Sequence, residues 1–348
     1  MRRVDNPPNP YESAHREWLE PPPPARVEVY EEHARSILSE NDSPDIPFRW
    51  SCNPYRGCQH ACAYCYARPT HEYLGLGAGT DFDTHLVVKV NAAELLAGVF
   101  SRPRWQGESV HFSGATDAYQ PLEAVYHLTR SCLETCLAHR NPAAVVTKSC
   151  LVARDADLLA ELNRVAGAQV CVSIPMADAA VSRAVEPQAP PPGRRFEAIR
   201  RLAQAGVPVG VLVAPLIPGL NDRDIPEVLQ RARQAGARRA NFVLLRLPGS
   251  VEQVFLERLR QALPLRAGRV EQRLRDARGG RLNDARFGCR MSGAGPYWDS
   301  VTRLFDAWRT RLGYDNAAHS GPVSESCDRC TVPAGNPGRK QVQLTLFD

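Results

Sequence analysis

From Pro47 to about Pro264, short apolar runs alternate with amphipathic stretches, and this alternation restricts the possible folds more than any other feature of the chain. The runs that have the length of buried strands are residues 109–114, 143–149, 168–175, 207–216 and 240–248. Strands that alternate with helices build βαβ units, so the sequence predicts a parallel sheet in an α/β fold. Five or six such units without a glycine-rich dinucleotide fingerprint favour a barrel or partial barrel over a Rossmann sheet. In such a barrel the chemistry lies at the C-terminal ends of the strands.

Residues 194–206 illustrate the helical stretches between these runs. Phe196, Ile199 and Leu202 lie on one face at helical spacing, and Gly206 suits the position that follows the last turn. We therefore expect an amphipathic helix that packs against the sheet and ends at this glycine.

Composition divides the chain into four parts. Residues 1–45 are rich in proline and charge and predict an extended arm with one helix over residues 27–40. Residues 46–265 form the predicted barrel, and residues 266–331 are an arginine- and glycine-rich C-terminal extension with weaker periodicity. The final part, residues 332–348, has the composition of a flexible tail.

Net charge and cysteine content indicate the kind of partner and the cellular compartment to expect. The net charge of +5 and the pI near 8.7 suit a polyanionic partner without requiring one. The N-terminus lacks the apolar segment of a signal peptide, and the most apolar run, residues 207–220, is too short to span a bilayer. We therefore expect a cytoplasmic protein. In a reducing compartment, its eleven cysteines are more typical of metal binding or chemistry than of a disulfide framework.

Three cysteines, Cys58, Cys62 and Cys65, lie within eight residues. Thiolates are soft ligands that suit either zinc or an iron–sulfur cluster. A structural zinc needs four ligands, and the fourth could come from His60, His71 or Cys52. The alternative is a [4Fe–4S] cluster with three irons held by cysteine and one left open for a small chelating ligand. Spacing leaves both readings open, although a position after a first strand and before a series of βα units favours the cluster.

The spacing Cys58-x3-Cys62-x2-Cys65, with Tyr64 before the last cysteine, resembles the cluster motif of the radical S-adenosylmethionine (SAM) superfamily. Residues 53–71, 115–123, 145–149, 214–222 and 286–297 resemble its spore photoproduct lyase-like branch, often called DNA repair photolyases. The resemblance implies a partial (β/α)6 barrel and a [4Fe–4S] cluster whose open iron chelates SAM. It also implies reductive cleavage of SAM to a 5′-deoxyadenosyl radical that abstracts hydrogen from a substrate. A flavodoxin or ferredoxin is the electron donor that such an enzyme would use.

The resemblance also assigns roles to individual residues. Tyr64 and Tyr66 resemble the tyrosine pair of the lyases and are the candidate catalytic residues, with Tyr64 beside the adenine of SAM. Lys148 and Ser173 fall where the lyases contact SAM, and Thr116 fills a position that is serine in the lyases. From the residues alone, Lys148 could equally be a snorkelling lysine and Ser173 a strand hydroxyl bonded to the backbone.

Two carboxylates complete the predicted cofactor site. Asp117 belongs to a polar group after a predicted strand, and we expect it to face the SAM or substrate cavity, although it could also cap a helix. The other members of that group are Tyr119, Gln120 and Glu123. Glu186 could bond a ribose hydroxyl or be an ordinary surface carboxylate. Near it, Arg183, Arg194 and Arg195 could meet phosphates, but loop arginines are usually solvated.

One departure from the lyases concerns the substrate radical. Characterised spore photoproduct lyases carry a cysteine just after the second strand that returns hydrogen to the product radical. The matching residues here, 114–116, contain no thiol. The substrate, or the way in which the radical is quenched, is therefore expected to differ, and the chain is not expected to be a spore photoproduct lyase proper.

The remaining cysteines allow weaker predictions. Cys327 and Cys330 form a second Cys-x2-Cys pair, which could hold a metal with Cys289 but is more simply a pair of free thiols in a tail. The cysteines expected to be core or incidental residues are Cys52, Cys132, Cys136, Cys150 and Cys171.

Three functions remain open. The first is a radical SAM enzyme acting on nucleic acid, with DNA as substrate; the arginine-rich residues 273–290 favour it. The second is the same chemistry on another substrate, and the third is a non-catalytic zinc-dependent binding protein. The terminal Gln343, Leu344, Leu346 and Phe347 resemble the peptide with which bacterial DNA-processing proteins hold the sliding clamp. We therefore expect the clamp as a partner.

Overall fold

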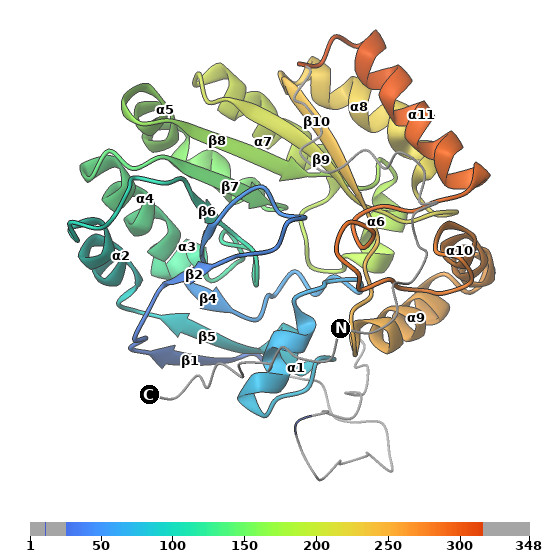
Figure 1. The fold of residues 1–348 in the computed structure, drawn as a ribbon, viewed down its shortest axis with the longest axis horizontal. Coiled ribbons are helices and arrows are strands. Elements are labelled where there is room, and N and C mark those ends of the chain that lie inside the picture. Colours follow the sequence, from blue (N-terminus) through green and yellow to red (C-terminus); the bar gives the residue numbers. More distant parts are fainter. Residues whose placement is uncertain (1–10, 12–25, 316–348) are drawn as a thin grey trace, which may run out of the picture.

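The computed structural model describes Tyr11 and residues 26–315, and its centre is a parallel sheet. Along the sheet the strands are ordered β10-β9-β8-β7-β6-β3-β2. They are β2 (Leu38–Glu40), β3 (Trp50–Cys52), β6 (Val110–Phe112), β7 (Ala143–Thr147), β8 (Ala168–Ser173), β9 (Val209–Leu216) and β10 (Arg239–Leu244). Neighbouring strands from β3 to β10 are parallel, and β2 pairs antiparallel with β3. The predicted α/β fold with six parallel barrel strands is thus confirmed, and Figure 1 shows these strands as an open arc.

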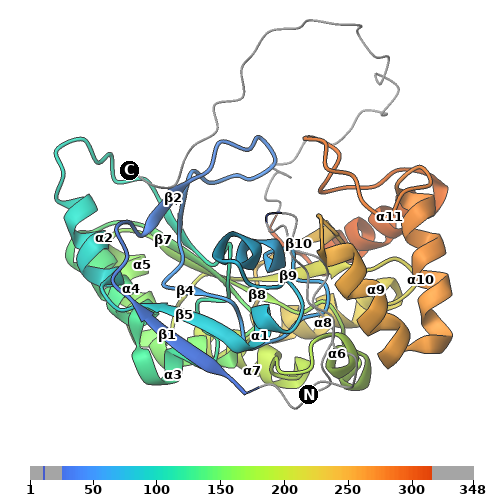
Figure 2. The ribbon, with the colours of Figure 1, turned by 90° about the horizontal axis from the view of Figure 1, so that it is seen from below.

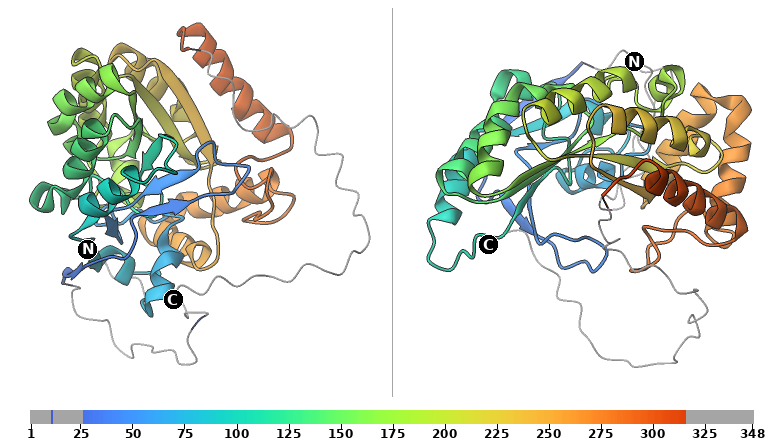
Figure 3. Two further views of the ribbon diagram at one scale, coloured as in Figure 1. Left: turned by 60° about the vertical axis from the view of Figure 1, so that its left-hand side comes forward. Right: turned by 90° about the horizontal axis from the view of Figure 1, so that it is seen from above.

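Helices connect these strands and cover the outer side of the arc, as the right-hand view in Figure 3 shows. They are α2 (Ala92–Phe100), α3 (Glu123–Tyr126), α4 (Leu128–Ala138), α5 (Ala156–Val165), α6 (Ala179–Val185), α7 (Pro192–Gln204), α8 (Ile225–Gln234) and α9 (Val251–Ala262). The helix expected over residues 194–206 is α7. It begins at Pro192, because proline suits a first-turn position that needs no N–H. Gly206 follows its end at a φ of 82°.

One face of the sheet is buried and the other is mostly half-buried, so most strand positions carry apolar residues and the strands appear in the sequence as continuous apolar runs. Val145, Val170, Val172, Val211 and Val213 are each no more than 1% exposed. The expectation for the core cysteines is confirmed for Cys52, Cys132 and Cys136, which are fully buried, whereas Cys150 and Cys171 are half-buried.

The helix predicted over residues 27–40 is wrong, because this segment forms strands. Here β1 (Glu28–Glu32) pairs parallel with β5 (His85–Lys89), and β5 pairs antiparallel with β4 (Tyr55–Arg56) in a separate three-stranded sheet (Figure 2). Pairing with β1 satisfies the backbone groups along one edge of β5, and this long-range gain outweighs the local helical tendency of the segment. Beyond β1, the Asn91 side chain accepts from the backbone N–H of Ala34 and donates to its carbonyl, both at 2.9 Å.

Two helices follow the barrel, although the sequence there has weak periodicity. They are α10 (Pro264–Ala277) and α11 (Pro296–Arg311), and α11 packs against α8 and α10 (Figure 1). Trp298 and Phe305 are the buried anchors of α11. The Cys327–Cys330 pair and the clamp-like residues 343–347 lie outside the described residues. In the described part of the chain, no helix is both long and apolar enough to cross a membrane.

Candidate metal centre

The three predicted ligand cysteines lie on one loop, which follows β3 and β4. We call residues 57–66 the cysteine loop. Its backbone is folded by turns: the N–H of Ala61 donates to the Cys58 carbonyl at 3.2 Å, and the N–H of Cys65 donates to the Cys62 carbonyl at 3.3 Å. The loop starts at Gly57, whose φ is +73° and where a Cβ would stand within 2.9 Å of three neighbouring atoms. Only glycine fits there, so the entry to the loop is fixed by its sequence.

Two arginines, Arg68, which is buried, and Arg258, which is 12% exposed, bind the backbone of this loop. Arg68 donates to the Cys62 carbonyl at 2.7 and 3.1 Å, and Arg258 from α9 donates to the Ala61 carbonyl at 3.0 Å. Both arginines also pair with Asp83, at 2.8 and 2.6 Å. Ala61 has a φ of 54°, which is unfavourable for a residue with a Cβ, so its conformation needs such outside support. The first and last βα units of the barrel therefore meet at the cysteine loop.

The charges around the loop suit anionic sulfur ligands. Burial raises the pKa of all three thiols, that of Cys62 to about 12, so without a metal they are neutral. Lys148 and Arg195 act in the opposite direction on Cys62, as Arg68 and Lys148 do on Cys65. Metal binding requires thiolates, and these cations would stabilise them. Beside Cys58, by contrast, the Asp117 carboxylate raises the pKa of the thiol further. The donor set of three soft thiols, two of them beside cationic groups, fits an iron–sulfur cluster.

The three residues that could supply a fourth zinc ligand each contact a group outside the ligand cysteines. His60 faces Asp117, with 3.4 Å between Nδ1 and Oδ2, and His71 Nε2 lies 2.7 Å from the His85 carbonyl oxygen. The Cys52 thiol forms a hydrogen bond with Cys132 in the core. Among the residues that the structure describes, no group of three or more His, Cys, Asp and Glu side chains is placed to hold a single metal ion.

The segment after β6 positions the cysteine loop. Thr116 Oγ1 donates to the Gly57 carbonyl at 2.6 Å, and Gln120 donates to the same carbonyl at 3.1 Å. The Gln120 side chain also accepts the Gln59 N–H at 3.0 Å. Thr116 and Gln120 thus lie within hydrogen-bonding distance of the loop that carries the thiols.

Asp117 joins this segment to the end of β7. It accepts from the Thr147 hydroxyl at 2.6 Å and from the Lys148 N–H at 2.8 Å, and it does not cap a helix. Burial acts to raise the pKa of this carboxyl, but His60 and the hydrogen bonds outweigh burial, so the pKa is lowered and Asp117 is ionised. The ends of β6 and β7 and the cysteine loop are therefore held together by one buried carboxylate.

Glu186 is not a surface carboxylate but the centre of a buried ion pair. It accepts hydrogen bonds from Tyr64, from Arg195 and, at 3.1 Å, from Ser182. Burial acts to raise the pKa of Glu186, but Arg195 and Lys148 lower it below its usual range, so the carboxylate is charged. The three arginines predicted on a loop lie on helices instead: Arg183 is on α6 and Arg194 on α7, both exposed, whereas Arg195 on α7 is fully buried.

The predicted SAM-contacting residues lie around this pair. Lys148 Nζ lies 5.6 Å from the centre of the Tyr64 ring, and burial, which lowers its pKa, is outweighed by Cys62 and Glu186, so the lysine is charged. Ser173, at the end of β8, donates to the Ala214 carbonyl at 2.9 Å, and its own carbonyl accepts from Arg195 at 3.0 Å. Arg195 thus links the end of β8 to Glu186 and Tyr64.

The two tyrosines of the motif have different environments. Tyr64 is 5% exposed and bonded to Glu186, whereas Tyr66 is 51% exposed. Arg246, just after β10, lies over the Tyr66 ring with 5.6 Å from Cζ to the ring centre. Tyr66, the last residue of the cysteine loop, therefore has an aromatic ring that is exposed to solvent.

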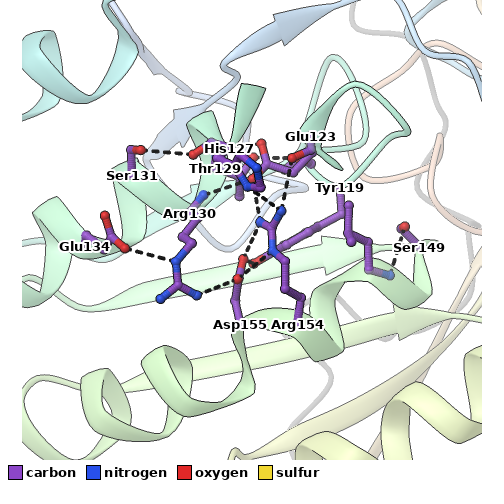
Figure 4. A network of polar contacts seen from close by, with 12 residues as sticks. Tyr119, Glu123, His127, Thr129, Arg130, Ser131, Glu134, Ser149, Arg154 and Asp155 are labelled. Carbon is purple, nitrogen blue, oxygen red and sulfur yellow. Dashed lines mark hydrogen bonds and ion pairs between the residues drawn. The ribbon is translucent and has the colours of Figure 1, made fainter. Parts of the chain in front are cut away.

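Glu123, grouped with Asp117 in the sequence, belongs to a different network (Figure 4). It accepts from the Tyr55 hydroxyl at 2.5 Å and pairs with Arg154 at 2.8 Å. Tyr119 donates to Asp155, which also pairs with Arg154. These bonds tie α3 and α4 to the turn after β7, so Glu123 and Tyr119 are structural residues.

Comparisons with known proteins identify the family of the chain. The model of the radical SAM superfamily matches residues 52–232. An uncharacterised protein of Mycobacterium tuberculosis is 39% identical over 221 residues, covering 63% of this chain and 65% of that protein, so this chain spans less than two thirds of that relative's length. A radical SAM Nα-GlyT isomerase of Pseudomonas phage M6 is 25% identical over 267 residues, covering 75% of this chain and 51% of that protein.

The fold has a counterpart among solved structures. Spore photoproduct lyase with bound AdoMet and dinucleoside spore photoproduct matches with a TM-score of 0.58 and 18% identity, over 82% of this chain and 80% of that one. This likeness concerns the fold alone. The family match begins at the end of β3, includes the cysteine loop and extends into α8, which is more than half of the chain. The protein belongs to the radical SAM superfamily.

Proposed function

We propose that Cys58, Cys62 and Cys65 hold a [4Fe–4S] cluster, that the enzyme cleaves SAM reductively there, and that its substrate is nucleic acid. The observation that carries the proposal is the set of three thiols on one loop, two buried and that of Cys65 half-buried, with the loop backbone bound by Arg68 and Arg258. When bound, such a cluster supplies one electron to the sulfonium of SAM, which yields methionine and a 5′-deoxyadenosyl radical.

The chain's own residues bind and orient SAM in this proposal. Lys148 is a charged donor beside Tyr64 and suits the carboxylate of the amino-acid head. Thr116, Asp117, Ser173 and Glu186 supply hydroxyl and carboxylate groups at or after the strand ends, and Glu186 would accept from a ribose hydroxyl. Tyr64 and Tyr66 would flank the reacting atoms, because they adjoin Cys65 on either side.

A nucleic-acid substrate is supported by three observations. The chain has a net charge of +5, and arginines gather after β10 and in the extension. Tyr66 offers an exposed ring on which a base could stack. The lyase that shares the fold holds a dinucleoside spore photoproduct in its structure.

The cluster and SAM cleavage are tested with anaerobically reconstituted protein. We expect broad absorbance near ~400 nm from thiolate–iron charge transfer and, with a strong reductant, formation of 5′-deoxyadenosine from SAM. Alanine at any one of the three cysteines should abolish both. Cleavage that survives all three substitutions, or a colourless zinc-loaded protein, would refute the assignment.

The substrate is tested separately. Incubation with irradiated DNA, SAM and reductant, followed by mass analysis, should show a lesion that disappears only when the cysteines are intact. SAM cleavage without any change in DNA would keep the radical chemistry and remove the DNA part of the proposal.

A further inference from the structure

Arg246 is placed where a barrel of this kind binds its substrate. It follows β10 at the C-terminal end of the sheet, and its guanidinium lies over the Tyr66 ring, next in the chain to Cys65. Its other contact is with Met291, at 3.6 Å from Nη1 to Sδ. Within residues 26–315, Arg246 has no ion pair with a carboxylate, so its charge is not balanced by a direct partner.

The groups around Arg246 increase this positive charge. Arg290 pairs with Asp45 at 2.5 Å, and Arg286 pairs with Asp284 at 2.7 Å, so the nearby carboxylates already have partners. Arg278 donates to backbone carbonyls, including that of Leu245 at 2.9 Å, and burial lowers its pKa to about 10. Burial and the nearby charge of Arg290 lower the pKa of Arg246 as well. An anion at Arg246 would relieve this repulsion.

Two exposed aromatic rings accompany these arginines. Tyr66 is 51% exposed, and Phe287 is 61% exposed with the Arg290 guanidinium 4.6 Å from its ring centre. Each ring is therefore paired with an arginine on the same side of the barrel. Alternating cations and aromatic faces are what a single nucleic-acid strand needs, because phosphates bind the cations and bases stack on the rings.

We infer that Arg246, supported by Arg290, binds a phosphodiester of a single nucleic-acid strand whose bases stack on Tyr66 and Phe287. This rests on the proposed nucleic-acid substrate and extends it to particular residues. The planar guanidinium forms paired hydrogen bonds with phosphate oxygens, and Tyr66 places the adjoining nucleotide beside the cysteine loop.

The test is binding of a fluorescent twelve-nucleotide single-stranded DNA to the full-length reconstituted protein with SAM, over a range of salt concentrations. Arg246→Gln should weaken binding about tenfold and make the slope of log affinity against log salt shallower by about 0.7, the value for one lost phosphate contact on a single strand. Arg246→Lys should restore the slope, since it keeps the charge. The matched control is Arg311→Gln on α11, which removes an exposed arginine that lies over the Trp308 ring, and it should change affinity less than twofold.

A second probe, the same oligonucleotide with neutral methylphosphonate linkages, should bind wild type and Arg246→Gln equally. Phe287→Ala should weaken binding of the natural strand several-fold without changing the salt slope, because it removes stacking and no charge. Equal losses for Arg246→Gln and Arg311→Gln, an unchanged slope, or no binding by the wild type would each overturn the inference. The proposed SAM chemistry is judged independently, from 5′-deoxyadenosine formed by the wild type without DNA.

Discussion

Replacing Arg195 with methionine should destabilise the protein strongly, although the residue lies near the start of a surface-facing helix. All three kinds of nitrogen in its guanidinium are used: Nε donates to the Pro190 carbonyl at 2.7 Å, Nη1 to the Ser173 carbonyl at 3.0 Å, and Nη2 to Glu186. Both side chains of the Arg195–Glu186 pair are fully buried. Methionine keeps most of the aliphatic stem, so the substitution mainly removes charge and hydrogen bonds.

The magnitude follows from what Arg195→Met leaves behind. The Glu186 carboxylate would remain buried without its ion partner, and removal of one partner of a buried pair typically costs about 3–5 kcal/mol. We therefore expect a loss of about 4 kcal/mol in the free energy of unfolding. Because domains of this kind are stable by about 5–15 kcal/mol, the variant should fold at 25 °C with a clearly lower denaturation midpoint.

The assay is urea unfolding at pH 7, followed by circular dichroism. The matched control is Arg200→Met on the same helix, whose ion pair with Glu197 is exposed to solvent and should contribute little to stability. Adding Glu186→Gln to Arg195→Met should recover part of the loss, since the unpaired buried charge is then gone. The reasoning is refuted if Arg195→Met costs no more than Arg200→Met, or if the double variant is less stable than Arg195→Met alone.

Three further predictions concern the cysteine loop, pH and recruitment. Arg258→Met should lower the iron retained after reconstitution, because Ala61 loses the donor that holds its left-handed conformation, whereas Arg260→Met, at an exposed position of the same helix, should leave iron content unchanged. Burial lowers the pKa of His111 to about 4, so between pH 6.5 and 4 the unfolded state binds more protons than the folded state. Lowering the pH through this range should therefore reduce the free energy of unfolding, by at most about 3 kcal/mol. His111→Gln should make this loss smaller in urea titrations compared at pH 7 and 4.5. A peptide of residues 340–348 should bind a bacterial sliding clamp at about micromolar affinity, and a peptide with its last leucine and phenylalanine changed to alanine should not; equal binding by both would end the clamp proposal.

Short sequence patterns correctly predicted the barrel strands and the position of the ligand cysteines on one loop. The barrel strands are visible as apolar runs because one face of each strand is buried and the other is mostly half-buried, and the ligand cysteines are visible because they share one loop. The strand β1 gave no such signal: four of its five residues are exposed, so its state is set by pairing with β5, more than fifty residues away.

The arginines that build the candidate site were missed for a related reason. Arg258 and the Ala61 carbonyl that it binds are 197 residues apart, and only the closure of the barrel brings them together. Arg195 lies beside Arg194, which is exposed, so composition does not distinguish the two. A helical periodicity argument could have found Arg195, because it lies next to Phe196 and one turn before Ile199 on the inner face of α7.

The distribution of charge around the cysteine loop bears on the proposed metal site, because it applies to both the metal-free and the metal-bound state. The carboxylates of Asp83, Glu186 and Asp117 neutralise most of the charge carried by Arg68, Arg258, Arg195 and Lys148, which leaves one cation in excess in this set. Without a metal, burial keeps the thiols protonated, so no uncompensated thiolate is buried. When thiolates form on metal binding, the remaining cationic charge and the metal itself would offset their charge. Arg68 and Arg258, which bind the loop backbone, therefore also place positive charge near the thiols. Their removal should lower metal retention more than the removal of an equal charge at the surface.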